Sequence, residues 1–327
     1  MAVKIEVLKK LEENREVFFS GETLAKELNV SRASVWKAIN QLKKEGYNIM
    51  AISNKGYCLS KETDVISKEG ILPYLKDIYK KINFHVYKSV ESTNKVAKEI
   101  ELRESNNDSI IISEEQTLGR GRLGRKFFSP EKTGIYMSIL IHPDVNLEDA
   151  TLITAATSVA LSRAIEKVTG IKTAIKWVND VFIKDRKVAG ILTEAATNFE
   201  SGKIDWVIIG VGINFNTPSN SFPEELKEIA TSIFEERPDE ITRNRLIGEI
   251  INEVMDLINP IDVDNFMEEY KEKSMVIGKN ITVKEKDNDF IAKAVDIDRK
   301  GQLIIRCKDG EIKKLHSGEI SIRTLSD

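Results

Sequence analysis

The sequence predicts a multidomain α+β protein, with a winged helix-turn-helix at the N-terminus, a mixed domain of strands and helices behind it, and a small β-barrel at the C-terminus. Three observations lead to this prediction. The chain of 327 residues exceeds the usual size of one domain. Its first part has helical periodicity that gives way to a hairpin pattern, and its middle mixes strand and helix patterns. Its tail has about five short strands separated by turn signals.

The winged helix-turn-helix is predicted over residues 1–64. Apolar residues recur at helical spacing in residues 4–11 and 24–28, and Ser31 is a good N-cap for a third helix, Arg32 to Lys44. Residues 48–59 then alternate around an Asn-Lys-Gly turn, as in a hairpin. The start of the third helix in such a domain usually meets the edges of DNA bases. We therefore predict DNA contacts from Ser31, Arg32, Ser34, Trp36 and Lys37.

The second domain is predicted over residues 65–273, after a polar boundary segment at residues 60–70. One long helix, about Leu147 to Val168, has Asn146 as its expected N-cap and Gly170 at its end. Helical patterns return over residues 241–273. The short links between strands favour antiparallel hairpins over a doubly wound parallel sheet. The expected strands are residues 84–87, 110–113, 136–141, 171–177, 181–184, 188–194 and 204–209.

The third domain is predicted over residues 274–327. Its short strands are punctuated by Asp287-Asn288, Lys300-Gly301 and Asp309-Gly310, which are typical turn pairs. The pattern indicates a small β-barrel.

The bulk composition excludes several classes of function. A net charge of -3 argues against a chain that coats nucleic acid along its whole length, so any DNA contact is local. No run of about eighteen or more apolar residues could span a bilayer, and no membrane partner is expected. The two cysteines, Cys58 and Cys307, suggest neither a disulfide framework nor a thiolate metal site, and they fit a reducing cytoplasm. The three histidines lack ligand spacing, so no histidine-based catalysis is predicted.

The segment Gly119 to Arg125 sets three arginines between three glycines. Flexible backbone and guanidinium groups can together wrap around a phosphate or a carboxylate, which indicates an anion clamp. From this string alone, an exposed basic turn or a nonspecific RNA-binding segment explains the pattern equally well.

Two lysines lie where predicted strands end or begin. Lys176 to Asp180 ends one strand and Lys187 to Gly190 opens the next but one, so the two lysines can converge near one end of the sheet. Two ammonium groups there suit a reaction between two anions, such as a carboxylate attacking a nucleotide phosphate. Asn179 and Asp180 add oxygen ligands for Mg²⁺. Taken alone, residues 184–187 are also typical of a solvated turn.

Two further strings have both a functional and a structural explanation. Gly210 to Asn214 follows the expected strand 204–209 and indicates either close backbone approach to a ligand or a plain exit from the strand. Ser92 to Asn94 indicates either a helix cap or a set of polar groups for a polar ring. The sequence has no P-loop signature, so any use of ATP relies on a different phosphate-binding element.

An ordered series of strings carries a resemblance to a known family. The strings are Ser92-Thr93-Asn94, Gln116, Gly119 to Arg125, Lys176 to Asp180, Lys187 to Gly190 and Gly210 to Asn214. In this order they resemble the bifunctional biotin protein ligase and biotin operon repressor family, and the resemblance runs over essentially the whole chain. It implies a central fold like that of class II aminoacyl-tRNA synthetases and an SH3-like C-terminal domain. It also implies that biotin and Mg-ATP give biotinyl-5′-AMP and pyrophosphate, and that biotin then moves to a lysine of the biotin carboxyl carrier protein of acetyl-CoA carboxylase.

The resemblance also assigns roles to residues. Those expected to bind biotin are Ser92, Thr93, Asn94, Gln116, Gly119, Arg120, Gly121, Arg122, Lys187, Gly190, Gly210 and Gly212. Those expected to bind ATP or the adenylate are Arg122, Arg125, Lys176, Asn179, Lys187 and Asn214. The expected catalytic residues are Lys187, Arg120, Arg122, Lys176 and Asp180. The expected magnesium ligands are Asn179 and Asp180.

The resemblance implies a second function, in which biotinyl-5′-AMP acts as a corepressor, promotes a homodimer, and so represses biotin genes at their operator DNA. The alternatives are a ligase whose winged helix regulates nothing, a repressor with an inactive catalytic domain, and a lipoate ligase. The presence of Lys187 argues against an inactive domain, and the glycine-arginine loop argues against a lipoate ligase.

The sequence departs from the family pattern at two places. Val178 stands where most members have proline. No tryptophan follows Asn214, so the contacts to adenine stay open.

Overall fold

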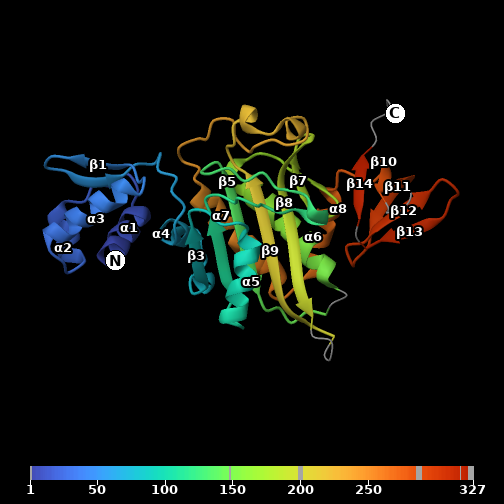
Figure 1. Ribbon diagram of the computed structural model, residues 1–327, viewed down its shortest axis with the longest axis horizontal. Helices are drawn as coiled ribbons and strands as arrows, with labels where there is room; N and C mark the ends of the chain where they lie inside the picture. The colour runs from blue at the N-terminus through green and yellow to red at the C-terminus, as the bar shows by residue number, and fades with distance from the viewer. Residues whose placement is uncertain (1, 147–148, 198–201, 285–288, 317, 323–327) are drawn as a thin grey trace. The chain divides into compact units, whose positions relative to one another are not determined.

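The computed structural model describes residues 2–146, 149–197, 202–284, 289–316 and 318–322 (Figure 1). The chain divides into two compact units, Met1–Lys81 with Glu236–Ile251, and Ile82–Glu235 with Asn252–Asp327. Within the described ranges, none of the helices has the length and apolar character that crossing a membrane requires.

The N-terminal part has the predicted winged helix-turn-helix. Helices α1 (Ala2–Glu13), α2 (Gly21–Glu27) and α3 (Arg32–Lys44) are followed by a hairpin of β1 (Ile49–Ile52) and β2 (Gly56–Leu59). Ser31 caps α3 as predicted, because its side chain accepts a hydrogen bond from the backbone N–H of Ser34 at 3.1 Å. Asn54 and Gly56 take positive φ angles of 65° and 102° in the hairpin turn. The third helix therefore has the bounds that the sequence predicted.

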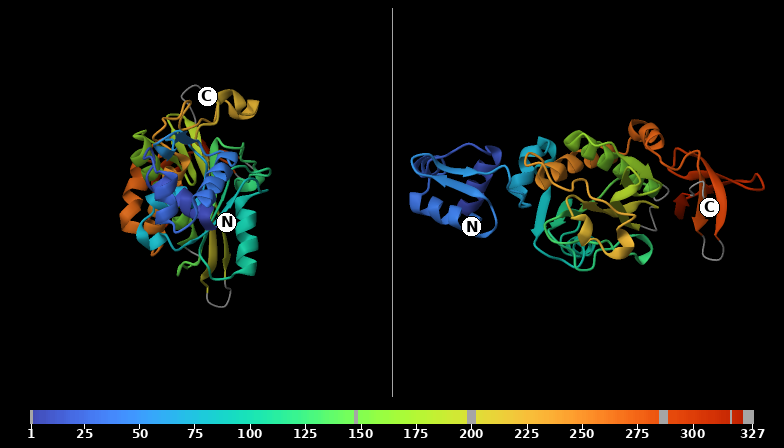
Figure 2. Two further views of the ribbon diagram at one scale, coloured as in Figure 1. Left: turned by 90° about the vertical axis from the view of Figure 1, so that its left-hand side faces the viewer. Right: turned by 90° about the horizontal axis from the view of Figure 1, so that it is seen from above.

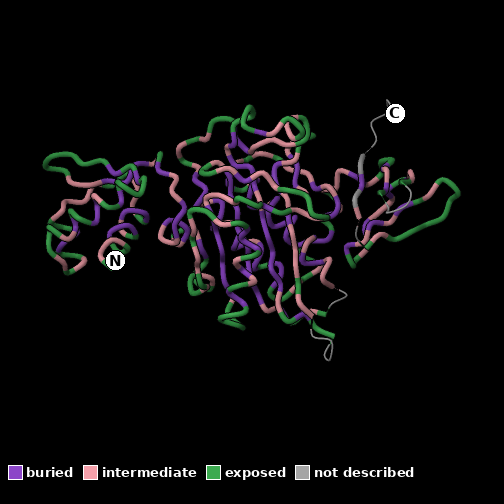
Figure 3. Tube along the Cα trace, viewed as in Figure 1, coloured by how far each residue is buried: buried purple, intermediate pink, exposed green. Residues whose placement is uncertain are grey.

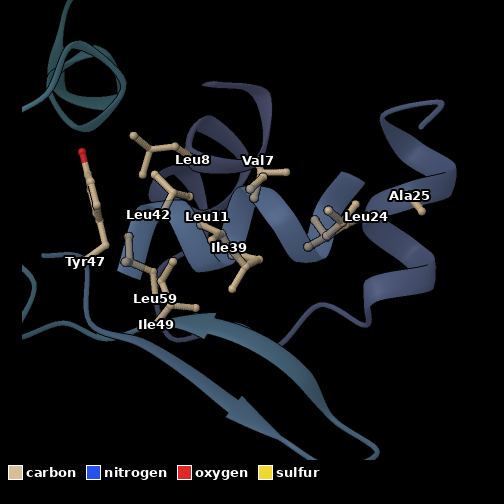
Figure 4. Close-up of a cluster of buried hydrophobic side chains, with 12 residues drawn as sticks. Val7, Leu8, Leu11, Leu24, Ala25, Ile39, Leu42, Tyr47, Ile49 and Leu59 are labelled. Carbon is tan, nitrogen blue, oxygen red and sulfur yellow. The ribbon is translucent and has the colours of Figure 1, made fainter. Parts of the chain in front are cut away.

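One apolar core holds these helices and the hairpin together (Figure 4). Leu11, Leu24 and Leu42 come from the three helices, Leu59 comes from the hairpin, and all four are fully buried. Burying one leucine side chain stabilises a fold by roughly 1.5–3 kcal/mol. The recognition helix is thus fixed by its buried face, and its other face is left to solvent.

The polar segment at residues 60–70, which ends in α4 (Lys68–Ile71), is held by the start of α7 (Arg243–Ile258). Asp64 accepts hydrogen bonds from the backbone N–H of Arg243 at 2.7 Å and from its Nε at 2.9 Å, and Arg243 is 2% exposed. Asn244 adds a bond from its Nδ2 to the Val65 carbonyl at 2.9 Å. Residues far apart in sequence therefore belong to the same compact unit.

Seven strands of the described chain form the mixed sheet of the second unit, in the order β3-β4-β5-β9-β8-β7-β6. Their bounds are β3 (Asn83–Tyr87), β4 (Ser109–Ser113), β5 (Gly134–Ile141), β6 (Ala174–Lys176), β7 (Asp180–Ile183), β8 (Arg186–Thr197) and β9 (Ile204–Asn214). In this sheet β3 and β4 run parallel, and each later pair of neighbours is antiparallel, as the short links predicted. Buried residues concentrate along the central strands β4, β5 and β9 (Figure 3).

Helices α5 (Thr93–Arg103) and α6 (Ala150–Thr169) cover opposite faces of this sheet. Glu194 of β8 accepts a hydrogen bond from Lys98 of α5 at 2.6 Å. The next residue back, Thr193, is hydrogen-bonded to Thr154 of α6 at 2.8 Å. Since successive side chains on a strand point to opposite faces, the two helices lie on different sides. Helix α8 (Val263–Glu272) packs against α6 (Figure 2).

Three local expectations are corrected. The strand expected at 204–209 continues to Asn214, because β5 pairs with residues 207–214 and β8 with residues 204–213, so Gly210 to Asn214 are not an exit from the strand. The N-cap of α6 is Asp149, not Asn146, which instead bridges to Lys203; the expected first residue, Leu147, lies outside the described residues. The strand expected at 171–177 is shorter, because Thr173 donates its backbone N–H to the Glu166 side chain.

The C-terminal part has an antiparallel sheet of five described strands in the order β13-β12-β11-β10-β14, which matches the number expected. These are β10 (Asn280–Lys284), β11 (Phe290–Ile297), β12 (Leu303–Cys307), β13 (Ile312–Leu315) and β14 (Glu319–Ile322). The indole Nε1 of Trp177 donates to the Gly301 carbonyl at 2.9 Å, which connects the turn before β12 to the segment after β6.

Candidate functional site

A cavity of about 630 Å³ lies in the second unit, within the size range of small-molecule sites. It brings together the N-terminus of α5, the glycine-arginine loop, and strands β8 and β9. The predicted residues that line it are Ser92, Thr93, Asn94, Gln116, Arg120, Gly121, Arg122, Arg125, Lys176, Asn179, Asp180, Lys187, Gly190, Gly210, Gly212 and Asn214. Gly119 is not among the lining residues. A Cβ atom there would lie 2.4 Å from the Phe127 carbonyl oxygen, so its glycine is needed for packing of the loop.

The cavity lining carries an excess of positive charge, with seven lysine and arginine residues against three acidic ones. Lys187 Nζ lies 2.7 Å from Asp180 Oδ1, and the two side chains are 32% and 24% exposed. Arg122 donates from Nη1 to Asn179 Oδ1 at 3.1 Å. Cations gathered in a partly desolvated cavity favour an anionic ligand. The arrangement therefore suits phosphate and carboxylate groups.

Three strand glycines make room for side chains of the cavity. A Cβ atom on Gly190 would lie 2.9 Å from Lys187 Nζ, and one on Gly210 would lie 2.3 Å from Asn94 Oδ1. A Cβ atom on Gly212 would lie 2.6 Å from the ring of Phe127. From the sequence, two explanations for Gly210 and Gly212 stayed open: close approach of the backbone to a ligand, or an ordinary exit from the strand. The structure gives a different reason, since each glycine accommodates a neighbouring side chain.

The polar floor of the cavity lies at the start of α5. Ser92 occupies the N-cap position, but its side chain makes no cap hydrogen bond. Gln116 Oε1 accepts hydrogen bonds from the backbone N–H of Thr93 at 2.9 Å and from its hydroxyl at 3.2 Å. Asn94 Nδ2 donates to Glu194 Oε2 at 2.8 Å. These side chains are thus ordered by one another, as a site for a polar ring requires.

Sequence reasoning missed several lining residues. Phe128 and Phe222 have ring centroids 5.9 Å apart beside the cavity, and Ile229 contributes from the segment after β9. Lys279 reaches the cavity from the C-terminal part. Gly278 precedes it with φ 83°, and the Lys279 backbone bonds to Val276 and Ala294 at 3.0 Å each, so its position is fixed. No motif marks these residues, because only the fold brings them to the cavity.

The backbone at Val178 is held by buried hydrogen bonds. Its carbonyl accepts from the Tyr270 hydroxyl at 3.0 Å and from the Ser158 hydroxyl at 3.3 Å. Burial raises the pKa of Tyr270, so this hydroxyl keeps its proton and remains a donor. The peptide bond between Trp177 and Val178 is cis. Asn179 and Asp180 therefore follow a segment whose position does not depend on proline.

The predicted DNA-contact residues lie together at the start of α3. Arg32, Trp36 and Lys37 are exposed, Trp36 to 58%. In the described part of the chain no side chain pairs with any of the three. Ser31 and Ser34 are bonded to each other, which keeps the first turn of the helix in place.

Comparisons with known proteins agree with this architecture. Family models match an HTH domain over residues 4–58, the Biotin/lipoate A/B protein ligase family over residues 86–214, and the Biotin protein ligase C terminal domain over residues 276–323. The fold and the cavity therefore define a class, a protein ligase domain joined to a helix-turn-helix domain.

Relatives with both parts narrow this class. The bifunctional ligase/repressor BirA of Bacillus subtilis is 34% identical over 313 residues, covering 93% of this chain and 94% of the relative. The protein of the same name from Escherichia coli is 27% identical over 310 residues, covering 94% of each. The biotin protein ligase from Aquifex aeolicus in complex with biotin and ATP has a TM-score of 0.60 and 29% identity, covering 74% of this chain and 98% of that chain. The chain belongs to the family of bifunctional biotin protein ligases and repressors.

Proposed function

We propose that this protein joins biotin to ATP, transfers the biotinyl group to a lysine of a biotin carboxyl carrier protein, and represses biotin genes when biotinyl-5′-AMP is bound. The observation that carries the ligase assignment is a single cavity whose polar floor adjoins an array of cations. The polar floor suits the ureido ring of biotin, and the cations suit the carboxylate and the triphosphate. Both functions are supported by the similarity to a bifunctional ligase/repressor, which covers 93% of the chain.

The first step is attack of the biotin carboxylate on the α-phosphorus of ATP, with pyrophosphate as the leaving group. Lys187 is the proposed catalytic cation, because Asp180 holds its ammonium group within the cavity at 2.7 Å. A fixed cation lowers the repulsion between two anions and stabilises the charge that develops in the transition state. Arg120, Arg122 and Lys176 would hold the remaining phosphate charge. In the second step the carrier lysine amine attacks the acyl carbon and AMP leaves.

Mg²⁺ is proposed to accompany ATP. Asp180 is the better protein ligand, because a carboxylate suits this hard cation. Asn179 fits less well, since its Oδ1 already accepts from Arg122 and its Nδ2 donates to the Ile191 carbonyl at 2.8 Å. The ion would supply charge neutralisation at the phosphates.

Three functional parts are proposed: a DNA-binding part at residues 1–64, a ligase part at 65–273 and a C-terminal part at 274–327. The matches to family models at residues 4–58, 86–214 and 276–323 support this division. Arg32, Trp36 and Lys37 are exposed and have no side-chain partner among the described residues, which supports DNA contact by the first part.

The ligase assignment is tested by incubating the full chain with biotin, ATP and an isolated carrier domain, followed by mass measurement of the carrier. The expected result is a gain of one biotinyl group that requires both ATP and biotin. Lipoate in place of biotin should give no gain. A carrier that gains lipoate, or that gains nothing while the protein is folded, would contradict the assignment.

The repressor assignment is tested by titrating DNA from upstream of biotin genes with and without biotinyl-5′-AMP, and by sedimentation in both states. The adenylate should promote a homodimer, since a palindromic operator requires two recognition helices. It should tighten DNA binding by about 1–3 kcal/mol, and DNA should tighten adenylate binding equally. Equal DNA affinity and equal dimerisation in both states would leave a ligase without a regulatory switch.

A further inference from the structure

Ser138 is a fully buried serine in β5 that contacts the cavity residues without lining the cavity itself. We propose that Ser138 is a positioning residue. Its single hydroxyl proton is shared between two oxygen atoms of the cavity floor, and the cavity therefore selects a ligand that brings its own N–H donor. This inference rests on the proposed function, because it assigns that donor to the ureido ring of biotin.

The geometry around Ser138 is specific. Its Oγ lies 2.7 Å from Thr93 Oγ1 and 2.6 Å from Asn94 Oδ1, which are hydrogen-bond distances for oxygen pairs. Thr93 and Asn94 both line the cavity and are 3% and 5% exposed. Ser138 pairs in register with Gly210, whose missing side chain leaves room for the Asn94 amide. The serine thus touches two groups that face the ligand.

The orientation of the Asn94 amide is fixed from the side away from Ser138. Its Nδ2 donates to Glu194 Oε2 at 2.8 Å and to the Leu192 carbonyl at 3.3 Å, and these two groups only accept. Burial works to raise the pKa of Glu194, but hydrogen bonds from Lys98 and Asn94 outweigh it and lower this pKa, so Glu194 is a carboxylate at neutral pH. Asn94 must therefore present an oxygen, an acceptor, to Ser138.

The orientation of Gln116 is fixed in the same way. The backbone N–H of Thr93 can only donate, so the atom of Gln116 that lies 2.9 Å from it is the carbonyl oxygen. The amide nitrogen of Gln116 donates to Ser129 Oγ at 3.1 Å. Gln116 therefore has no donor directed at Thr93 Oγ1.

A count of protons gives the consequence. Ser138 has one hydroxyl proton and two acceptors within reach, and no other donor among the described residues reaches Thr93 Oγ1 or Asn94 Oδ1. The Thr93 hydroxyl uses its own proton on Gln116 Oε1. When Ser138 donates to Asn94 Oδ1, Thr93 Oγ1 therefore keeps a lone pair that can accept a hydrogen bond, and when Ser138 donates to Thr93 Oγ1, Asn94 Oδ1 keeps one. A ligand N–H can fill this acceptor position and gain a hydrogen bond. A cyclic urea brings N–H groups to this point, whereas the dithiolane ring of lipoate brings none. Ser138 therefore contributes to selectivity for biotin.

The test is Ser138→Ala in the full chain, with pyrophosphate release measured against biotin and against ATP. Removing the shared proton leaves both oxygens without a donor and lets the Asn94 and Thr93 side chains reorient. The KM for biotin should rise about 10-fold, while kcat and the KM for ATP should stay within about twofold. A general loss of structure would change all three quantities.

The matched control is Ser109→Ala. Ser109 is also a fully buried strand serine, but its hydroxyl donates to the Asn107 carbonyl at 3.2 Å, and it does not line the cavity. Its KM for biotin should equal that of the wild type. If the wild type releases no pyrophosphate in response to biotin, the proposed function fails. If the wild type is active and Ser138→Ala keeps the wild-type KM for biotin, or raises both KM values equally, the inference on Ser138 fails.

If Ser138→Ala does not fold, substitutions at Ser138 and Glu194 that change less still test the inference. Ser138→Cys retains only a weak donor and should raise the KM for biotin above that of the wild type while leaving the KM for ATP unchanged. Glu194→Gln keeps an acceptor for Asn94 and should bind biotin nearly as well as the wild type, whereas Glu194→Ala should not. Equal KM values for the two Glu194 variants would overturn the argument that this carboxylate orients Asn94.

Discussion

Gly210→Ala is the sharpest single test of the cavity floor, because the change adds one methyl group at a defined point. The new Cβ atom would lie 2.3 Å from Asn94 Oδ1 and 3.0 Å from its Nδ2. Since a carbon and an oxygen atom in contact are normally about 3.3 Å apart, the amide must move by about 1 Å. Its hydrogen bonds to Ser138 and Glu194, now 2.6 and 2.8 Å, would then exceed hydrogen-bonding distance.

The expected effect is on biotin. A displacement of about 1 Å in a group that positions a substrate can reduce the rate about 100-fold, and we expect kcat/KM for biotin to fall by about this factor. The KM for ATP should change little, because the cationic side of the cavity is untouched. Pyrophosphate release measures both quantities, and a thermal melt checks the fold.

A double variant provides the control. Asn94→Ala removes the side chain with which the new methyl group collides, so adding Gly210→Ala to Asn94→Ala should cost little more. The two changes should therefore be strongly non-additive. Wild-type kcat/KM for biotin in Gly210→Ala, or full additivity in the double variant, would refute the steric explanation for this glycine.

Three other predictions concern catalysis and stability. Lys187→Ala should slow pyrophosphate release by about 10²–10³ while the fold stays intact, and near-normal turnover would remove Lys187 from the catalytic set. Asp64→Ala should lower the free energy of unfolding in urea by about 3 kcal/mol, because the Arg243 guanidinium, 2% exposed, loses its ion pair with Asp64. Lys61→Ala breaks an ion pair whose side chains are 43% and 68% exposed and should leave the free energy of unfolding nearly unchanged, so equal losses in the two variants would contradict the argument from burial. Burial opposes the shift at Glu166, but hydrogen bonds from Lys273 and Thr173 lower its pKa from 4.5 to about 2, so the stability it contributes is complete above pH 4.5 and is lost as the pH falls toward 2. Unfolding of Glu166→Gln should differ most from the wild type above pH 4.5, and a difference that grows in acid would show the sign to be wrong.

The sequence by itself determined the local elements and the family. Ser31 and the apolar spacing of residues 32–44 predicted the recognition helix to the residue, because a cap and a helical period depend only on near neighbours. Positive φ angles at Asn54, Gly56 and Gly170 likewise came from residue type. The series of motifs predicted which residues would share a cavity, and of those assigned to ligand binding or catalysis all except Gly119 line it.

Only the tertiary structure decided which residues from distant parts of the sequence pair, pack together or reach the cavity. The string from Gly210 to Asn214 is strand because β5 and β8 both pair with it, and the hydrogen bonds of two neighbours outweigh the weak strand tendency of glycine. The boundary segment is held by Arg243, which lies 179 residues from Asp64 in the sequence. Lys279 and Ser138 carry no motif. Lys279 is placed by backbone bonds to Val276 and Ala294, and Ser138 reaches the cavity floor because β5 pairs with β9. Periodicity records only neighbours along the chain, whereas burial and hydrogen-bond partners are set by neighbours in space.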